Sequence, residues 1–144
     1  MNKILSTNAP SSIVLVRFLI AVVFVGEGIQ KFLFPQALGT GRFIKIGIPA
    51  PEIFAPFVGV VEIAGGLLVL FGLFTRFAAL ALTINISVAI ITTKIPMLFI
   101  DGISPMLHES RVDFCMFFGC IFLLIAGAGL LSIDYKLSKK KSTS

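Results

Sequence analysis

Three charged residues lie inside long apolar segments and are the strongest candidates for chemistry in this chain. Glu27 and Lys31 stand in the first apolar segment, and Glu62 stands in the second. A charge at the centre of a spanning helix costs at least ~2.5 kcal/mol on insertion scales, so each needs a physical reason to be there. Two carboxylates at similar depth in a dry interior do not both ionise easily. Such a pair suits a site that handles protons or binds a quinone.

The spacing of these residues indicates how they are used. Glu27 precedes Lys31 by four residues, which is the favourable order for an ion pair along a helix. Gly59 and Gly66 flank Glu62 at spacings of three and four, and small residues on one face mark a close approach between membrane helices. We therefore expect Glu62 to point into a bundle. Two interpretations stay open here, a functional site and a static polar network that holds the helices together.

The segment at 108–114, HESRVDF, concentrates an imidazole, two carboxylates and a guanidinium before the last apolar segment. It could line the mouth of a cleft that the three buried charges also form. The candidate cleft residues are then Glu27, Lys31, Glu62 and His108. The alternative is an ordinary solvated helix start that Ser110 or Glu109 caps.

We expect no resident redox centre and no metal site. Cys115 and Cys120 lie about 140° apart around a helix, and the chain has no C-x-x-C pair. The single histidine excludes bis-histidine haem within one chain and argues against a metal site. No glycine-rich phosphate loop follows a strand. Electrons for any redox reaction would come from a partner or a diffusing quinone, and whether the chain is itself an enzyme stays open.

Composition indicates that lipid is the solvent of this chain. Hydrophobic residues make up 57% and charged residues 13%, against about 45–50% and about 25% in soluble domains. A domain this small could not hide that much apolar surface from water. The net charge of +5 is concentrated in lysines after the last apolar segment, as in bases that face anionic headgroups. The chain has no basic stripe interleaved with aromatic residues, which argues against nucleic-acid binding.

Four apolar segments are long enough to cross a bilayer, which takes about 20 helical residues. Backbone groups in lipid must be satisfied internally, so these segments should be helices. The expected spans are approximately 13–34, 56–74, 77–100 and 114–133. We therefore expect an all-α integral membrane protein with a single domain over 1–144. Its four-helix bundle would run up-down-up-down and end in a basic cytoplasmic tail at 134–144.

Lysine and arginine near the spans predict the orientation. The count is almost even, with six on the side of both termini and five on the other. The dense tail lysines decide for the cytoplasm, and Lys3 and Arg76 lie on the same side. We expect both termini on the cytoplasmic face of a bacterial inner membrane.

Four other polar residues are expected to stabilise the bundle as a structural network. They are Arg17, Arg76, Asn85 and Asp113. Arg17 lies about one turn inside the first span, where it either snorkels to the headgroups or pairs with Asp134. Asn85 lies in the middle of the third span, where an interhelical hydrogen bond contributes about 0.6 kcal/mol.

The motifs, in order, resemble the DoxX family of small four-helix bacterial membrane proteins over nearly the whole chain. They are RFLIAVVFVGEGIQKFLFP, GRFIKIGIPAPE, FVGVVEIAGGLLVLFGLFTRFAAL, and ESRVDF followed by GAGLLSID. The resemblance implies an inner-membrane bundle and a loose association with oxidoreductases, through the membrane subunit of thiosulfate:quinone oxidoreductase. The family often has a histidine where this chain has Glu27, so no role of that histidine is carried over.

Three functions are compatible with these residues. The first is an accessory or quinone-interacting subunit of a membrane oxidoreductase system, with no resident cofactor and quinone as the candidate ligand. The second is a membrane scaffold that recruits soluble enzymes, and the third is a small proton-coupled transporter that uses Glu62. The expected partners are membrane lipid, a redox enzyme and a second copy of the chain.

Overall fold

The computed structural model describes residues 9–142, and every regular element within that range is helical. Lys3 and the last two residues of the expected tail lie outside the described residues. The helices are α2 (Ile13–Leu33), α3 (Thr40–Lys45), α4 (Pro51–Phe71), α5 (Thr75–Ala89), the π-helix η1 (Ile90–Lys94), α6 (Ile95–Asp101), α7 (Ile103–Glu109), α8 (Arg111–Ala126) and α9 (Ile133–Ser142). The all-α fold class is therefore confirmed.

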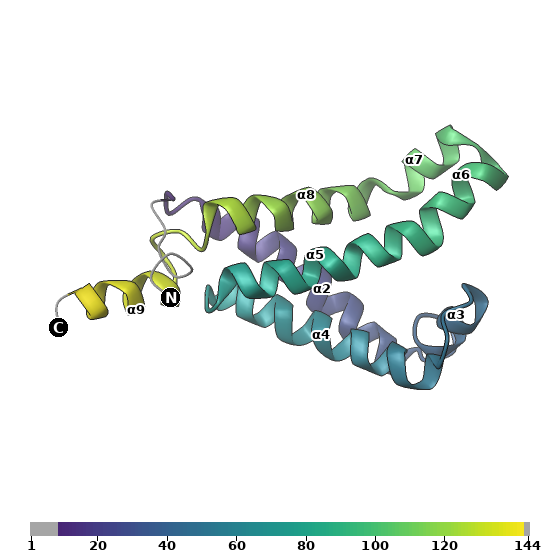
Figure 1. The fold of residues 1–144 in the computed structure, drawn as a ribbon, viewed down its shortest axis with the longest axis horizontal. Coiled ribbons are helices and arrows are strands. Elements are labelled where there is room, and N and C mark those ends of the chain that lie inside the picture. The colour runs from purple at the N-terminus through teal and green to yellow at the C-terminus, as the bar shows by residue number, and fades with distance from the viewer. Residues whose placement is uncertain (1–8, 143–144) are drawn as a thin grey trace.

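The long helices run alternately up and down the long axis of the molecule (Figure 1). α2 packs mainly against α4, and α5 packs mainly against α8. The core between these pairs is made of Ile20, Phe24, Val69, Leu82, Cys120 and Leu123. No residue of η1, α6 or α7 is buried, so the core lies toward the end at which α2 begins and the pairs diverge at the opposite end (Figure 1).

Three helical stretches are long and apolar enough to cross a membrane, judged by length and composition. They are Ile13–Leu33, Pro51–Phe71 and the continuous stretch Thr75–Asp101. The first and third agree closely with the expected spans. The second begins five residues earlier than expected, because Pro51 occupies the first helical turn, where its missing N–H breaks no helical bond.

The expected fourth span at 114–133 is not one continuous helix. α8 has 16 residues, whereas a helix needs about 20 to cross the hydrocarbon core of a membrane. It ends at Ala126, because the next residue, Gly127, has a φ of +80° that is readily adopted only by glycine. Gly129 has a φ of +79°. The following segment is irregular and partly buried, with Ala128 and Ser132 only 2% and 5% exposed but Leu130 and Leu131 exposed. The helical part of this segment is therefore shorter than expected.

A π-helix interrupts the third stretch at Ile90–Lys94. Pro96 explains it, because proline lacks the N–H that would bond the carbonyl of Thr92 and its ring clashes with that turn. The wider π turn relieves the clash while the helix continues into α6. The Thr93 hydroxyl donates a 2.6 Å hydrogen bond to the carbonyl of Ala89 at this irregular turn.

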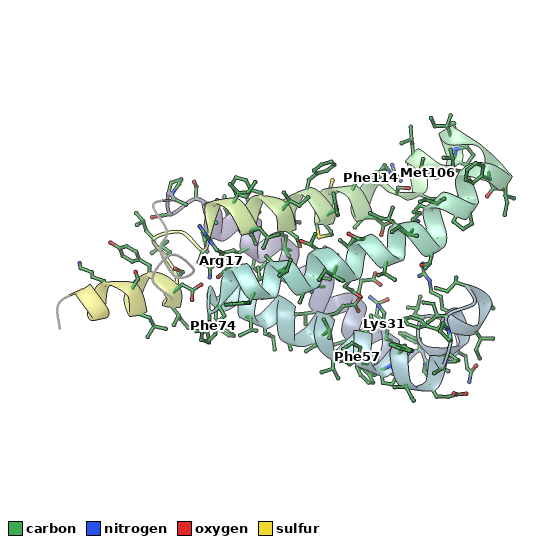
Figure 2. All side chains as sticks on the ribbon, in the orientation of Figure 1. Arg17, Lys31, Phe57, Phe74, Met106 and Phe114 are labelled. Carbon is green, nitrogen blue, oxygen red and sulfur yellow. The ribbon has the colours of Figure 1, made fainter. Side chains whose placement is uncertain are left out.

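Arg17 joins three segments at the end of the bundle next to α9 (Figure 2). Its side chain is buried and donates hydrogen bonds to the carbonyls of Val69 and Leu70 in the last turn of α4. It also donates to the carbonyls of Ala128 and Leu131 after α8, at 3.1 and 2.6 Å. The guanidinium thus supplies hydrogen bonds to carbonyls at the end of α4 and after α8, where regular helical bonding stops, and shares the Val69 carbonyl with the N–H of Gly72.

Asp134 closes the same junction from the other side. Its carboxylate accepts hydrogen bonds from the backbone N–H groups of Phe74 and Thr75, at 2.8 and 2.9 Å, and so caps the start of α5. Phe74 has a φ of +47°, a strained conformation for a residue with a side chain, and this cap stabilises it. The expected Arg17–Asp134 ion pair is not formed within 4.0 Å, and Arg17 does not snorkel to the headgroups.

Gly72 gives Arg17 the room to make these contacts. It ends α4 with a φ of +65°, and a Cβ at this position would lie 2.7 Å from the Arg17 Cζ and 2.6 Å from the Ser132 Cβ. The turn between α4 and α5 therefore needs glycine both for its backbone conformation and for the close approach of the guanidinium.

Replacing Arg17 with methionine should strongly destabilise the protein. The carbonyls of Leu70, Ala128 and Leu131 lose the donor that Arg17 supplies, whereas that of Val69 keeps the N–H of Gly72. Each unsatisfied buried group costs about 1–3 kcal/mol, and water that reaches the site reduces this cost. We expect the free energy of unfolding in mild detergent, followed by far-UV circular dichroism, to fall by about 2–4 kcal/mol. Arg17→Lys should recover only part of this loss, because one ammonium cannot reach both groups of carbonyls. Wild-type stability of Arg17→Met would contradict this account.

Candidate functional site

Lys31, Glu62 and Asn85 form a compact hydrogen-bonded cluster between three helices. The Lys31 Nζ lies 2.7 Å from the Glu62 Oε2, and the Asn85 Nδ2 donates a 2.8 Å hydrogen bond to the Glu62 Oε1. Glu62 is 5% exposed. Both oxygens of a buried carboxylate are therefore occupied by donors from two different helices.

Glycines allow α2 and α4 to approach closely enough for this contact. A Cβ on Gly28 would lie 2.7 Å from the carbonyl oxygen of Gly59, and a Cβ on Gly66 would lie 2.7 Å from the side chain of Val25. Gly59 and Gly66 thus face α2, as their spacing predicts. Glu62 lies between them and points into the bundle.

Lys31 reaches inward although it lies near the end of α2. Only two residues separate it from the end of the helix, where a lysine would ordinarily snorkel to the headgroups. Side chains of an α-helix tilt toward its N-terminus, which here is the direction of the bundle core. Its side chain is 11% exposed and ends on Glu62, which lies about 14 Å from the nearer end of α4. Figure 2 shows Lys31 on the part of the molecule away from Arg17.

Glu27 forms the edge of the cluster. Its Oε2 lies 3.9 Å from the Lys31 Nζ, a longer contact than the one that Lys31 makes with Glu62. The Glu27 side chain is 50% exposed. It lies about 9 Å inside the end of α2, so the exposed carboxylate is well within the apolar length of that helix.

The residues expected to form a structural network lie in separate places, and Asn85 is the one that belongs to this cluster. Asp113 pairs with Lys94 at 3.3 Å, and Lys94 also donates to the carbonyl of Glu109. Arg76 donates a 3.1 Å hydrogen bond to the carbonyl of Ile125. The expected structural residues are therefore distributed over separate places, and only Asn85 among them contacts the buried charges.

His108 is not brought to the buried cluster. It is exposed on α7, where its Nε2 lies 3.2 Å from the Arg111 Nη2 and its carbonyl accepts from the Arg111 Nε. Gly102, with a φ of +88°, separates α7 from α6 and places this segment beyond the core. Ser110 occupies the N-cap position of α8, but its hydroxyl donates to the Met106 carbonyl and makes no capping hydrogen bond.

Sequence reasoning did not assign Asn85 to Glu62 or Lys94 to Asp113. Both Asn85 and Lys94 are polar residues within an apolar stretch, which is a recognisable signal. Their partners depend on which helices are neighbours and on the register between them. Among residues 9–142, no three His, Cys, Asp or Glu side chains gather where they could hold a metal ion.

The residues that form this cluster lie within a segment that matches a known protein family. The family model DoxX matches residues 12–95 of this chain, more than half of its length. The chain belongs to the DoxX family. The resemblance seen in its motifs is therefore confirmed.

Three relatives of this DoxX chain differ in what their names say of them. The "Uncharacterized membrane protein Rv3486" of Mycobacterium tuberculosis is 46% identical, over 96% of this chain and 88% of the relative. The "Putative oxidoreductase CatD" of Bacillus subtilis is 29% identical, over 88% of this chain and 87% of the relative. An "Uncharacterized protein" of Haemophilus influenzae is 29% identical, over 91% and 94%. No solved structure matches the chain.

Removing the cation from the buried pair of this DoxX protein should cost more than removing both charges. Lys31→Met leaves Glu62 buried and uncompensated, which typically costs about 3–5 kcal/mol. The double variant Lys31→Met, Glu62→Met replaces the pair with apolar side chains and should regain most of that stability. Far-UV circular dichroism during denaturation in mild detergent measures the two single variants, Lys31→Met and Glu62→Met, and the double variant. Additive losses in the double variant would show that the two side chains do not interact energetically.

Proposed function

We propose that this chain is an accessory subunit of an oxidoreductase system in the bacterial cytoplasmic membrane, and that a quinone headgroup binds beside Lys31 and Glu62. The supporting observation is the buried pair itself. An ion pair inside a bundle rarely stabilises a fold better than apolar side chains of the same size, so its presence favours a role in binding or proton transfer. A related protein named as an oxidoreductase agrees with this class of function.

The donor set of the cluster fits a quinone carbonyl. An ammonium has three N–H donors, and the Lys31 Nζ makes one short contact, with Glu62. Its remaining donors are available for a carbonyl oxygen that enters from the exposed side at Glu27. Glu62 and Asn85 orient the ammonium and keep it inside the bundle.

A binding measurement on the full chain in nanodiscs tests this proposal, with decylubiquinone as the probe. We expect Lys31→Met to weaken binding by at least about tenfold, which corresponds to about 1.4 kcal/mol. Asn85→Ala should weaken it less, because it removes only the group that positions Glu62. Asp113→Asn is the matched control, since Asp113 belongs to the separate pair with Lys94 and should leave binding unchanged.

The outcome that contradicts the quinone proposal is the absence of saturable binding to the wild-type chain. Purification of the tagged chain from native membranes in mild detergent gives a second reading. Mass spectrometry of the co-purified proteins and extracted quinones should detect a redox enzyme or stoichiometric quinone. A ligand-free chain without such partners would leave proton-coupled transport as the function to test.

A scaffold role has one supporting feature. α9 extends away from the long helices beyond the Arg17 junction, and Lys136 and Lys139 on it are exposed (Figure 1). A basic helix held at its base by Asp134 could present a surface to a soluble acidic enzyme. If partners co-purify without quinone and are lost when α9 is deleted, the scaffold function is favoured.

The proposed topology has four crossings with both termini in the cytoplasm. The first three are the stretches that have the required length, and the fourth is α8 together with the irregular, partly buried segment that follows it. Arg17 supports this fourth crossing, because it supplies the hydrogen bonds that the irregular segment lacks. The lysines of the tail agree with a cytoplasmic end.

Cysteine labelling in intact cells checks this topology. In a chain with Cys115→Ser and Cys120→Ala, a membrane-impermeant maleimide should label Glu52→Cys and Asp101→Cys. Lys136→Cys should react only after the membrane is permeabilised. Equal labelling of Asp101→Cys and Lys136→Cys in intact cells would place both ends of α8 on one side and contradict the fourth crossing.

A further inference from the structure

We propose that the hairpin formed by α6 and α7, residues 95–109, is embedded in the outer leaflet of the membrane. Lipid acyl chains would surround α6, and α7 would lie along the boundary between membrane and water. The expected span at 77–100 places α7 in a loop outside the bilayer, so this is a different position for that segment. The proposal rests on the third crossing of the proposed topology and does not depend on quinone binding.

The third stretch is longer than a crossing requires. Thr75–Asp101 has 27 residues and is therefore about 40 Å long, whereas the hydrocarbon core is about 30 Å thick. Its last part, α6, either projects into water by about 10 Å or stays in the bilayer because the stretch is inclined. The two helix pairs diverge toward this end, where α6 and α7 lie apart from α3 (Figure 1). This divergence favours the inclined stretch.

α6 presents apolar side chains in every direction around its axis. They are Ile95, Met97, Leu98, Phe99 and Ile100. At about 100° per residue, these positions leave no polar face. Phe99 and Ile100 are 82% and 80% exposed, and no residue of α6 is buried. A protein partner covers one face of a helix, whereas acyl chains cover all of them, so lipid is the occupant that fits α6.

α7 is instead divided into two faces. Ile103, Met106 and Leu107 lie within about 100° of one another around its axis, and Ile103 and Leu107 are exposed. The other side of the helix is formed by Ser104, Pro105, His108 and Glu109. A helix with one apolar and one polar face is typical of the membrane–water interface.

The base of the hairpin is fixed to α8. The Lys94 Nζ lies 3.3 Å from the Asp113 Oδ2 and donates a 3.2 Å hydrogen bond to the carbonyl of Glu109. At the other end, Gly102 has a φ of +88° at the turn between α6 and α7, and Asp101 beside it is exposed. The inclination of α5 and α8 therefore sets the position of the hairpin, and Asp101 at its tip reaches the headgroups.

Single-tryptophan variants test this position directly, because the chain contains no tryptophan. The full chain is reconstituted in vesicles of brominated phosphatidylcholine, whose bromines quench tryptophans in contact with acyl chains. Iodide on both sides of the membrane quenches tryptophans in water. Phe99→Trp and Ile103→Trp should lose most of their fluorescence in lipids brominated near the carboxyl end of the chains, and little in iodide. Ile84→Trp, in the exposed middle of α5, is the reference for lipid contact within the third crossing.

Two adjacent residues of α7 provide a matched pair of charge variants in the Phe99→Trp chain. Ile103→Asp places a carboxylate on the apolar face, so lipid quenching should fall and iodide quenching should rise. Ser104→Asp adds the same charge to the polar face and should leave both unchanged. Neither residue is buried, so far-UV circular dichroism should show the same helix content in both variants.

Strong iodide quenching of Phe99→Trp and Ile103→Trp would show that the hairpin projects into water and would overturn the proposal. Protection from both quenchers would overturn it as well, since the hairpin would then be covered by a second copy or by another part of the chain. Equal effects of Ile103→Asp and Ser104→Asp would overturn the interfacial position of α7. Absence of lipid quenching in Ile84→Trp would overturn the third crossing itself, so a failure of the topology is distinguishable from a failure of the hairpin.

Discussion

The hydrogen bonds of the buried Arg17 guanidinium are the interaction on which the closed end of the bundle depends. The carbonyls of Leu70 and Ala128 belong to segments far apart in the sequence, and both accept a hydrogen bond from Arg17. In a lipid environment, backbone carbonyls outside regular helices have little water to bond with. The planar guanidinium of Arg17 has five N–H donors, so it can bond both the end of α4 and the irregular segment after α8. Because this end is closed, α5 and α8 are fixed relative to α2 and α4.

At the opposite end the two helix pairs diverge, and the buried charges lie where the apolar core stops. Glycines hold α2 against α4, which brings Lys31 within reach of Glu62. Asn85 then connects this pair of helices to α5. The result is a polar cluster whose inner side is sealed by packing and whose outer side, at Glu27, is half exposed. A site with this asymmetry can exchange a small ligand or a proton while the core stays dry.

The candidate site was partly predictable from residue types. Charges within apolar segments identified Glu27, Lys31 and Glu62, because an apolar environment makes any charge unusual. The same reasoning could not find the role of Asn85, since its contact with Glu62 depends on the register between α4 and α5. It also misplaced His108, because density of polar residues along the sequence says nothing about the direction in which α7 leaves the core.

The sequence by itself determined the helical class, the family and the approximate ends of three apolar stretches. These properties follow from hydropathy, motif order and hydrogen bonds between residues four apart, all of which are local. Only the tertiary structure decided the partners of Arg17 and Asp134 and the contact of Lys31 with Glu62. It also showed that α8 ends at Ala126 and is followed by Gly127. Beyond that point Arg17, which is distant in the sequence, donates a hydrogen bond that the helix no longer supplies. Such features depend on side chains from segments far apart in the sequence, whose meeting is settled by packing.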